Sequence, residues 1–149
     1  MARETVLYAP SGNADALILK DPKNLRPRPL NPFDVIKVDS LKITALSLNH
    51  GIETLGYLVE ENEKSIALLY DTKSLPEKTM SFLSEKAPLR LAVVDATYSP
   101  KVNDPYHNNV DEAAEIGLNL AEKNCSHPYI TQEPTFSRTG KLCAKEMGE

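Results

Sequence analysis

Four side chains in this sequence have the types and placement that metal or acid–base chemistry requires: His50, Asp71, Asp95 and His107. Imidazole and carboxylate are the usual protein ligands of Zn²⁺, and they also serve Mn²⁺ and iron. His50, Asp71 and Asp95 each stand at the end of a strand-like run, where a rigid element can deliver a side chain to a site. Each also has an ordinary alternative as a surface, capping or turn residue. The third histidine, His127, is interpreted as a loop residue.

The elements that would position these side chains begin with an antiparallel meander. Apolar and polar residues alternate over 35–38 and 41–48, which is the period of a half-buried strand. The run 54–60 predicts a third strand, and the apolar run 65–70 predicts a buried one. Because the connections are short, strands that follow one another in the sequence should lie side by side.

Two helices and two more strands complete the predicted pattern. Ser74 is expected to cap the first helix, with Glu77 three residues on, and this helix should end near Glu85. After it come a buried strand at 89–94, a second helix at about 110–123 and a last strand that begins at Tyr129. Asn108 or Asn109 is expected to cap the second helix. This order predicts an α/β sandwich with helices packed outside sheets.

The residues before this pattern predict a short strand at 5–9 and helical character at 13–20. Prolines at positions 22, 27, 29 and 32 then predict a loop, because proline lacks the backbone N–H that a helix or a central strand requires. This proline-rich segment is therefore expected to cross between elements without forming one.

Composition and charge narrow the class of protein. With 149 residues, 41% of them hydrophobic and 26% charged, the chain fits one ordinary globular domain. Its net charge of −4 argues against nucleic acid as a partner, because no basic surplus exists to neutralise phosphates. No apolar run approaches the ~20 residues that cross a bilayer, and no signal-peptide core follows the N-terminus. We therefore expect a cytoplasmic protein that does not enter a membrane.

Several short segments, in a fixed order, carry a family resemblance. Residues 48–60 place a histidine and glycine before a Gly-Tyr-hydrophobic strand, and residues 69–72 read Leu-Tyr-Asp-Thr. Residues 73–79 begin Lys-Ser-Leu-Pro-Glu, residues 94–98 read Val-Asp-Ala-Thr-Tyr, and residues 107–115 put a histidine before an Ala-containing helix. Together these segments resemble the metallo-β-lactamase superfamily, in the branch of ribonuclease Z and of the phosphoribosyl cyclic phosphodiesterases.

The resemblance implies a hydrolase with two divalent cations, Zn²⁺ or Mn²⁺, that acts on a phosphodiester. His50 would bind one metal, and Asp71 would bridge both. His107 would face the scissile phosphate as a phosphate contact or a general acid. Asp95 would not bind the metal itself but would orient a side chain that does. Two cations about 3.5–4 Å apart hold the phosphate oxygens and stabilise the charge that develops as phosphorus is attacked.

The chain departs from the family at both ends. The family's His-x-His-x-Asp-His motif is absent, so residues 1–131 are expected to form a partial, truncated αββα sandwich that lacks the first half. The family's last strand ends in a metal-binding histidine, whereas Gln132 stands here, and a neutral amide is a poor zinc ligand. The tail 132–149 loses all periodicity, and we hypothesise that it is non-native sequence after a lost reading frame. A sheet face left uncovered by the missing half should cause association.

Two classes of function follow from the resemblance. In the enzymatic hypothesis the complete protein hydrolyses a small cyclic phosphate or a phosphoribosyl cyclic phosphate, with ribonuclease Z-like RNA processing as the alternative. In the other hypothesis the chain is a non-catalytic remnant, or half of a split enzyme whose partner chain supplies the missing half. A homo-oligomer is the other expected assembly. The chain alone is expected to be inactive, because a catalytic zinc needs three protein ligands.

Overall fold

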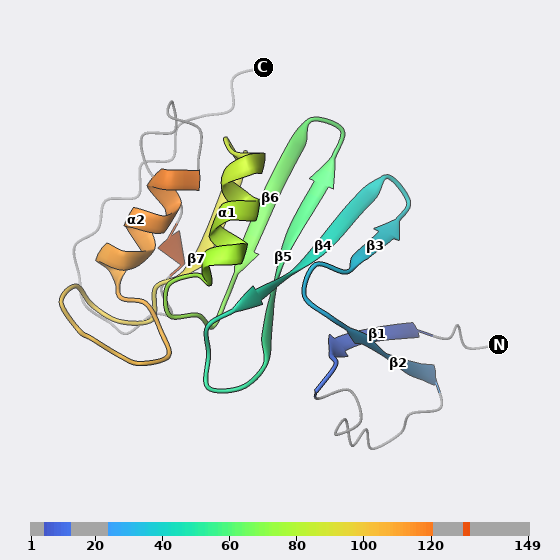
Figure 1. Ribbon diagram of the computed structural model, residues 1–149, viewed down its shortest axis with the longest axis horizontal. Helices are drawn as coiled ribbons and strands as arrows, with labels where there is room; N and C mark the ends of the chain where they lie inside the picture. The colour runs from blue at the N-terminus through green and yellow to red at the C-terminus, as the bar shows by residue number, and fades with distance from the viewer. Residues whose placement is uncertain (1–4, 13–23, 121–129, 132–149) are drawn as a thin grey trace.

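The computed structural model describes residues 5–12, 24–120 and 130–131, which form two sheets and two helices (Figure 1). The larger sheet has the strand order β3-β4-β5-β6-β7-β8, with bounds Val35–Val38, Leu41–Leu48, Thr54–Glu61, Lys64–Leu69, Leu91–Asp95 and Ile130–Thr131. The smaller sheet pairs β1 (Thr5–Pro10) with β2 (Leu25–Leu30), and the helices are α1 (Glu77–Lys86) and α2 (Val110–Leu120). Neither of these described helices is long and apolar enough to cross a membrane.

The predicted antiparallel meander is confirmed in β3 to β6. Each of these strands pairs antiparallel with the next one in the sequence. The direction then changes, because β7 pairs parallel with β6 and β8 pairs parallel with β7. Helix α1 lies in the crossover between β6 and β7, and α2 lies between β7 and β8. The predicted α/β class is therefore confirmed, with more sheet than helix.

Both helices pack against one face of the six-stranded sheet (Figure 1). Helix α1 contributes Leu83 to the core, and α2 contributes Ala113, Ile116 and Leu120. The strands contribute Leu46, Leu48, Leu58, Ala67, Leu69, Ala92 and Val94. Burying one leucine side chain stabilises a fold by roughly 1.5–3 kcal/mol relative to leaving it exposed. This core therefore holds the strand ends on which the candidate site residues stand.

The opposite face of the sheet is also apolar, and neither helix covers it. The register places Ile43 opposite Val59, and Tyr57 opposite Leu68. These side chains are half-buried and lie outside the core under the helices, as do those of Leu55, Ile66, Leu91 and Val93. Partial burial raises the pKa of Tyr57 above its ordinary value of 10.0. An apolar face of this kind is suited to packing against another element.

The start of α1 differs from the prediction, whereas the start of α2 agrees with it. Pro76, not Ser74, is the N-cap residue of α1, and no side chain caps the helix there. Ser74 has a left-handed φ of 52°, and its N–H donates to Oδ1 of Asn108 at 2.7 Å. At α2, Oδ1 of Asn109 accepts the Glu112 N–H and Oε2 of Glu112 accepts the Asn109 N–H, both at 3.0 Å. This reciprocal pair is a capping box, which leaves Asn108 for the tertiary contact.

The proline-rich segment contains a strand, so the prediction of a loop there was wrong. Strand β2 pairs parallel with β1 and places Pro27 opposite Leu7, with Pro29 two residues further on. In a parallel strand, only alternate residues donate a backbone hydrogen bond to a given neighbouring strand. Prolines two residues apart can therefore both stand where an N–H would point away from β1, so the pairing loses no hydrogen bond. Residues 13–20, predicted as a helix, and the tail 132–149 lie outside the described residues.

Candidate functional site

The strand ends that carry the candidate residues meet at one edge of the six-stranded sheet. Strands β4 and β6 both pair antiparallel with β5, so they run in the same direction, and β7 runs parallel to β6. Their carboxyl ends therefore lie along a single edge. His50 follows β4, Asp71 follows β6, and Asp95 is the last residue of β7. His107 reaches the same edge in the loop before α2.

Three of the four predicted residues form a compact cluster. One ligand atom from each of Asp71, Asp95 and His107 lies within 4.8 Å of the others. His50 lies beside this cluster, with its ring centroid 5.0 Å from that of His107 and the two rings edge to face. Asp71 is exposed, the two histidines are half-buried, and Asp95 is only 6% exposed. The structure thus brings all four residues to one place, at different depths.

The carboxylate of Asp95 is fully used by hydrogen bonds. Its Oδ1 accepts the N–H and the hydroxyl of Thr97, at 3.0 and 2.6 Å. Its Oδ2 accepts the Thr72 N–H at 3.0 Å and Nδ1–H of His107 at 2.8 Å. Since a carboxylate has about four lone-pair positions, these bonds leave none for a cation. Asp95 is therefore suited to orienting other groups rather than to binding a metal.

The ring of His107 is held in one tautomer by this contact. Because Nδ1–H donates to Asp95 at 2.8 Å, Nε2 is the ring nitrogen that remains for a substrate or a cation. The backbone N–H of His107 donates to Oδ1 of Asp104 at 2.9 Å, so the main chain is fixed as well. An imidazole oriented by a buried carboxylate can give or take a proton at a defined point.

Asp71 is presented by an unusual turn at the end of β6. Its φ of 51° is left-handed, a conformation that Asp and Asn tolerate better than most other residues. The buried hydroxyl of Thr72 accepts the Asn49 N–H at 3.1 Å and donates to the Ser74 carbonyl at 2.7 Å. The Lys73 N–H donates to the Asn49 carbonyl at 2.8 Å. These bonds join the loop after β6 to the loop after β4.

His50 stands against two aromatic rings of the loop before α2. Its ring centroid is 5.8 Å from that of Tyr106 and 5.0 Å from that of His107. Nδ1 of His50 lies 3.4 Å from the Tyr106 carbonyl oxygen, which leaves Nε2 as the freer ring nitrogen. The position of His50 therefore depends on this loop as well as on β4.

Asp104 shapes the loop that carries His107. Its Oδ1 accepts the N–H groups of Tyr106 and His107, both at 2.9 Å. These bonds, with that from Tyr106 the larger effect, lower the pKa of Asp104 below its ordinary value of 3.8. The charge of Asp104, with a hydrogen bond to it, raises the pKa of Tyr98 above 10.0. The loop is thus closed around an ionised carboxylate.

An ion pair ties the start of α2 to the loop after β6. Nζ of Lys73 lies 2.6 and 2.8 Å from the two carboxylate oxygens of Glu112, and 3.4 Å from Oδ1 of Asn103. The hydrogen bond from Lys73, followed by that from the Asn109 N–H, lowers the pKa of Glu112 below its ordinary value of 4.5. The ion pair therefore links the two loops that carry Asp71 and His107.

Sequence reasoning does not identify the residues that hold the site together: Thr72, Thr97, Asp104 and Asn108. Thr72 and Asn108 are fully buried. A threonine or asparagine beside a strand end nevertheless looks like any other turn residue in a sequence. One signal is available for Asp104, because an acidic residue two or three positions before a loop amide commonly accepts its hydrogen bond.

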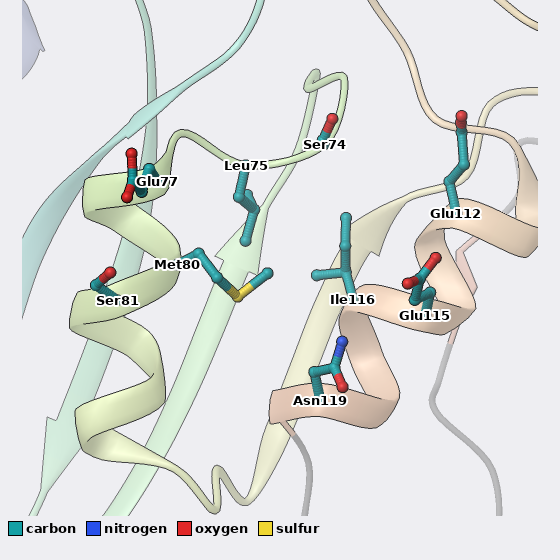
Figure 2. A pocket seen from close by; sticks show the side chains of 9 residues that line it. All are labelled: Ser74, Leu75, Glu77, Met80, Ser81, Glu112, Glu115, Ile116 and Asn119. Carbon is teal, nitrogen blue, oxygen red and sulfur yellow. The ribbon is translucent and has the colours of Figure 1, made fainter.

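A separate cavity of about 540 Å³ lies between α1 and α2 (Figure 2). Leu75 and Met80 approach it from the α1 side, and Ile116 faces it from α2. Its remaining lining residues are Ser74, Glu77, Ser81, Glu112, Glu115 and Asn119. None of the four candidate residues lines this cavity. The four candidate residues therefore lie at the sheet edge and not in the crease between the helices.

The donor groups at the edge fit a divalent cation in type but are too few for two. His50 offers an imidazole and Asp71 an exposed carboxylate, which are ordinary ligands of Zn²⁺ and Mn²⁺. Nε2 of His107 is the next available donor, and Asp95 is occupied by hydrogen bonds. A catalytic zinc usually has three protein ligands, and a two-metal site needs more. The described residues thus offer donor groups for one cation but not a complete ligand set for two.

Solved structures identify the fold, whereas no sequence-family model and no curated protein matches the chain. A diphosphatase from the PhnP family matches with a TM-score of 0.65 and 23% identity, over 86% of this chain and 46% of that one. The metallo-β-lactamase fold protein YhfI from Bacillus subtilis matches with a TM-score of 0.61 and 15% identity, over 76% and 47%. The short form of human tRNase Z matches with a TM-score of 0.64 and 15% identity, over 91% and 67%.

The matches cover only part of the solved structures. The chain spans about half of the diphosphatase and of YhfI, at 46% and 47% of their lengths. At identities of 23% and below, the likeness concerns the fold. The strand order, the two helices on one face and these matches agree with the resemblance in the sequence. The described chain therefore has part of the metallo-β-lactamase fold.

Proposed function

We propose that this chain supplies part of a metal-dependent phosphodiesterase site, which acts on a small cyclic phosphate or a phosphoribosyl cyclic phosphate. The observation that supports this function is the bond from His107 to the buried Asp95, beside the exposed carboxylate of Asp71. This group lies at the edge of a sheet whose structural relatives include a diphosphatase and a tRNase. The combination suits metal-assisted hydrolysis at phosphorus.

Each of the four residues has a distinct role in this proposal. His50 and Asp71 would hold Zn²⁺ or Mn²⁺, and the cations would supply positive charge for the phosphate oxygens and the attacking water. His107 would give a proton from Nε2 to the oxygen that leaves phosphorus, as the P–O bond breaks. Asp95 would keep the ring oriented and compensate the charge of the imidazolium form.

The remaining metal ligands would come from a further polypeptide segment, on this or another chain, that covers the face of the sheet away from the helices. That face presents half-buried apolar residues on four neighbouring strands, such as Ile43, Val59, Ile66 and Leu91. Two sheets packed face to face lie ~10 Å apart, so a second sheet would bring its own strand ends beside this edge. Association of two copies through the same face is the alternative assembly. In both cases residues 1–149 alone would be inactive.

Binding of Mn²⁺ tests the assignment of ligands. Paramagnetic Mn²⁺ should broaden the ring-proton NMR signals of His50 and His107 at lower concentrations than those of the tyrosines far from the edge. Asp71→Asn should raise the Mn²⁺ concentration that broadens these signals by about tenfold or more, because it removes the charge of the carboxylate. Asparagine also tolerates the φ of 51° at this position. Asp39→Asn is the matched control, since Asp39 has the same φ of 51° in another turn. Equal effects of the two substitutions would refute the assignment.

RNA processing of the ribonuclease Z type is the second candidate function. The match to human tRNase Z, with a TM-score of 0.64, supports it at the level of the fold. The net charge of −4 favours the small substrate instead, because holding an RNA backbone takes a basic surplus. We propose that the protein acts in the cytoplasm with either substrate.

A further inference from the structure

An exposed aromatic ring stands at the mouth of the candidate site and has no role in the chemistry above. Tyr106 is 50% exposed, and its ring centroid is 5.8 Å from that of His50. The next residue in the chain is His107, which is proposed to protonate the leaving oxygen. A planar group attached to a phosphate at this site would therefore come to lie close to the Tyr106 ring.

The main chain at Tyr106 is held by contacts with Asp104 and His50. Its N–H donates to Oδ1 of Asp104 at 2.9 Å, and its carbonyl oxygen lies 3.4 Å from Nδ1 of His50. Gly51 leaves room for the ring, because a Cβ atom at that position would lie 3.2 Å from Cε1 of Tyr106. Nδ2–H of Asn109 donates to the carbonyl oxygen of residue 102 at 2.9 Å, which braces the same loop. An aromatic ring on a restrained main chain, seated beside His50 and Gly51, loses less conformational entropy when a ligand stacks on it than a ring on a free loop does.

We propose that Tyr106 determines substrate specificity by stacking on a nucleobase. This inference rests on the proposed phosphodiesterase function and narrows its substrate to a nucleoside phosphodiester, in preference to a sugar phosphodiester without a base. Stacking on an aromatic ring accepts every base, because each base has a π face. Tyr106 therefore selects for the presence of a base, while the residues at the sheet edge act on the phosphate.

Saturation-transfer NMR on the full chain, without metal, tests this proposal with two probes. One probe is adenosine 3′,5′-cyclic phosphate, and the other is a methyl ribofuranoside 3,5-cyclic phosphate, which has no base. The base protons of the first probe should receive more saturation than its ribose protons. The second probe should bind about tenfold or more weakly, which is the loss expected for one stacked base.

Three substitutions separate stacking from simple packing against His50. Tyr106→Phe keeps the ring and should retain the preference for the probe with a base. Tyr106→Ala and Tyr106→Leu remove the ring, and both should bring the affinities of the two probes together. Equal affinities in the wild-type chain, absence of binding, or a preference that survives in Tyr106→Leu would overturn the proposal.

The same samples distinguish a failure of this inference from a failure of the proposed function. Added Mn²⁺ should shorten the relaxation time of the ³¹P signal of the bound probe, since the phosphate would lie beside His50 and Asp71. Base saturation without ³¹P relaxation would contradict the phosphodiesterase site and leave Tyr106 as a base-binding ring. Relaxation of ³¹P without base saturation would overturn the stacking role of Tyr106 and leave the proposed phosphodiesterase site intact.

Discussion

At the scale of single residues, Asp95 organises the edge of the sheet without being available to a cation. It accepts hydrogen bonds from Thr97, Thr72 and His107, which belong to three different segments of the chain. Because it is 6% exposed, solvent cannot replace a partner that is lost. The orientation of His107 and the turn after β6 therefore depend on one carboxylate.

Replacing this carboxylate with an amide should destabilise the protein. In Asp95→Asn one oxygen becomes an NH₂ group, so at least one of the present donors loses its acceptor inside the fold. We expect the free energy of unfolding to fall by about 1–3 kcal/mol, measured by urea denaturation. Asp39→Asn, at an exposed position, should change it by less than about 0.5 kcal/mol. A loss for Asp95→Asn no larger than that of the control would contradict the role of Asp95.

The sequence allows the proximity of the four candidate residues to be predicted, but not their separate roles. His50, Asp71 and Asp95 follow strands whose alternating pattern predicts the same sheet edge. One of the four hydrogen bonds to Asp95 comes from Thr72. The Thr72 N–H contacts Asp95 and its hydroxyl contacts Asn49, each 23 residues away along the chain. Such contacts arise from packing, and no local pattern encodes them.

At the scale of elements, the loops after β4 and β6 behave as one unit joined through Thr72. Its hydroxyl bridges the Asn49 N–H and the Ser74 carbonyl in a buried position. The arrangement places the two proposed metal ligands on a shared support. A change at Thr72 should therefore affect both ligands without touching either.

Thr72→Val removes the hydroxyl and preserves the shape of the side chain. The Asn49 N–H then loses its acceptor, so the free energy of unfolding should fall by about 1–3 kcal/mol. Amide hydrogen exchange at Asn49 should become faster, which NMR can measure directly. Thr72→Ser retains the hydroxyl and should keep the slow exchange. Equal exchange rates in the Val and Ser variants would show that the bridge is not a stabilising contact.

The start of α2 should respond to pH through Glu112. Its pKa lies below 4.5 because of Lys73 and the Asn109 N–H, so its charge stabilises the fold at pH values above 4.5. This contribution disappears as the pH falls through the lowered pKa of the folded state. Lys73→Met should move the pKa of Glu112 upwards, toward 4.5, as followed by the NMR shift of the carboxyl carbon. An unchanged titration midpoint in Lys73→Met would contradict the importance of the ion pair.

The elements themselves are largely predictable from the sequence, with two instructive exceptions. The meander and both helices follow from hydrophobic period and short connections. Strand β2 does not, because its alternating prolines remove the local signal of a strand while still permitting an edge. Ser74 looks like a helix cap, yet its backbone is drawn to Asn108 by the packing of the two helices.

At the scale of the whole molecule, the chain has one well-formed core and one sheet face that neither helix covers. The diphosphatase and YhfI are about twice as long as the parts that this chain matches, since 46% and 47% of them are covered. An apolar sheet face that neither described helix covers promotes association, because neighbouring molecules can bury it. The oligomeric state of the isolated chain should therefore depend on this face.

Leu68→Thr should reduce self-association of the chain. Leu68 lies between Tyr57 and Val93 near the middle of this sheet face, and threonine keeps a strand-compatible backbone while adding a hydroxyl. Sedimentation velocity should show fewer oligomers at equal concentration than for the wild type. Leu118→Thr is the matched control, because Leu118 is 64% exposed on α2, away from the sheet. Equal sedimentation of the two variants would contradict a role of this sheet face in self-association.

We propose that this chain holds part of a two-metal phosphodiesterase site and is inactive alone. The most direct test is the metal content of the purified chain after incubation with Zn²⁺ or Mn²⁺ and desalting, with turnover of bis(p-nitrophenyl) phosphate measured on the same sample. We predict less than one retained metal per chain and no turnover, because His50 and Asp71 cannot hold two cations. Two retained metals with turnover by the chain alone would contradict the claim.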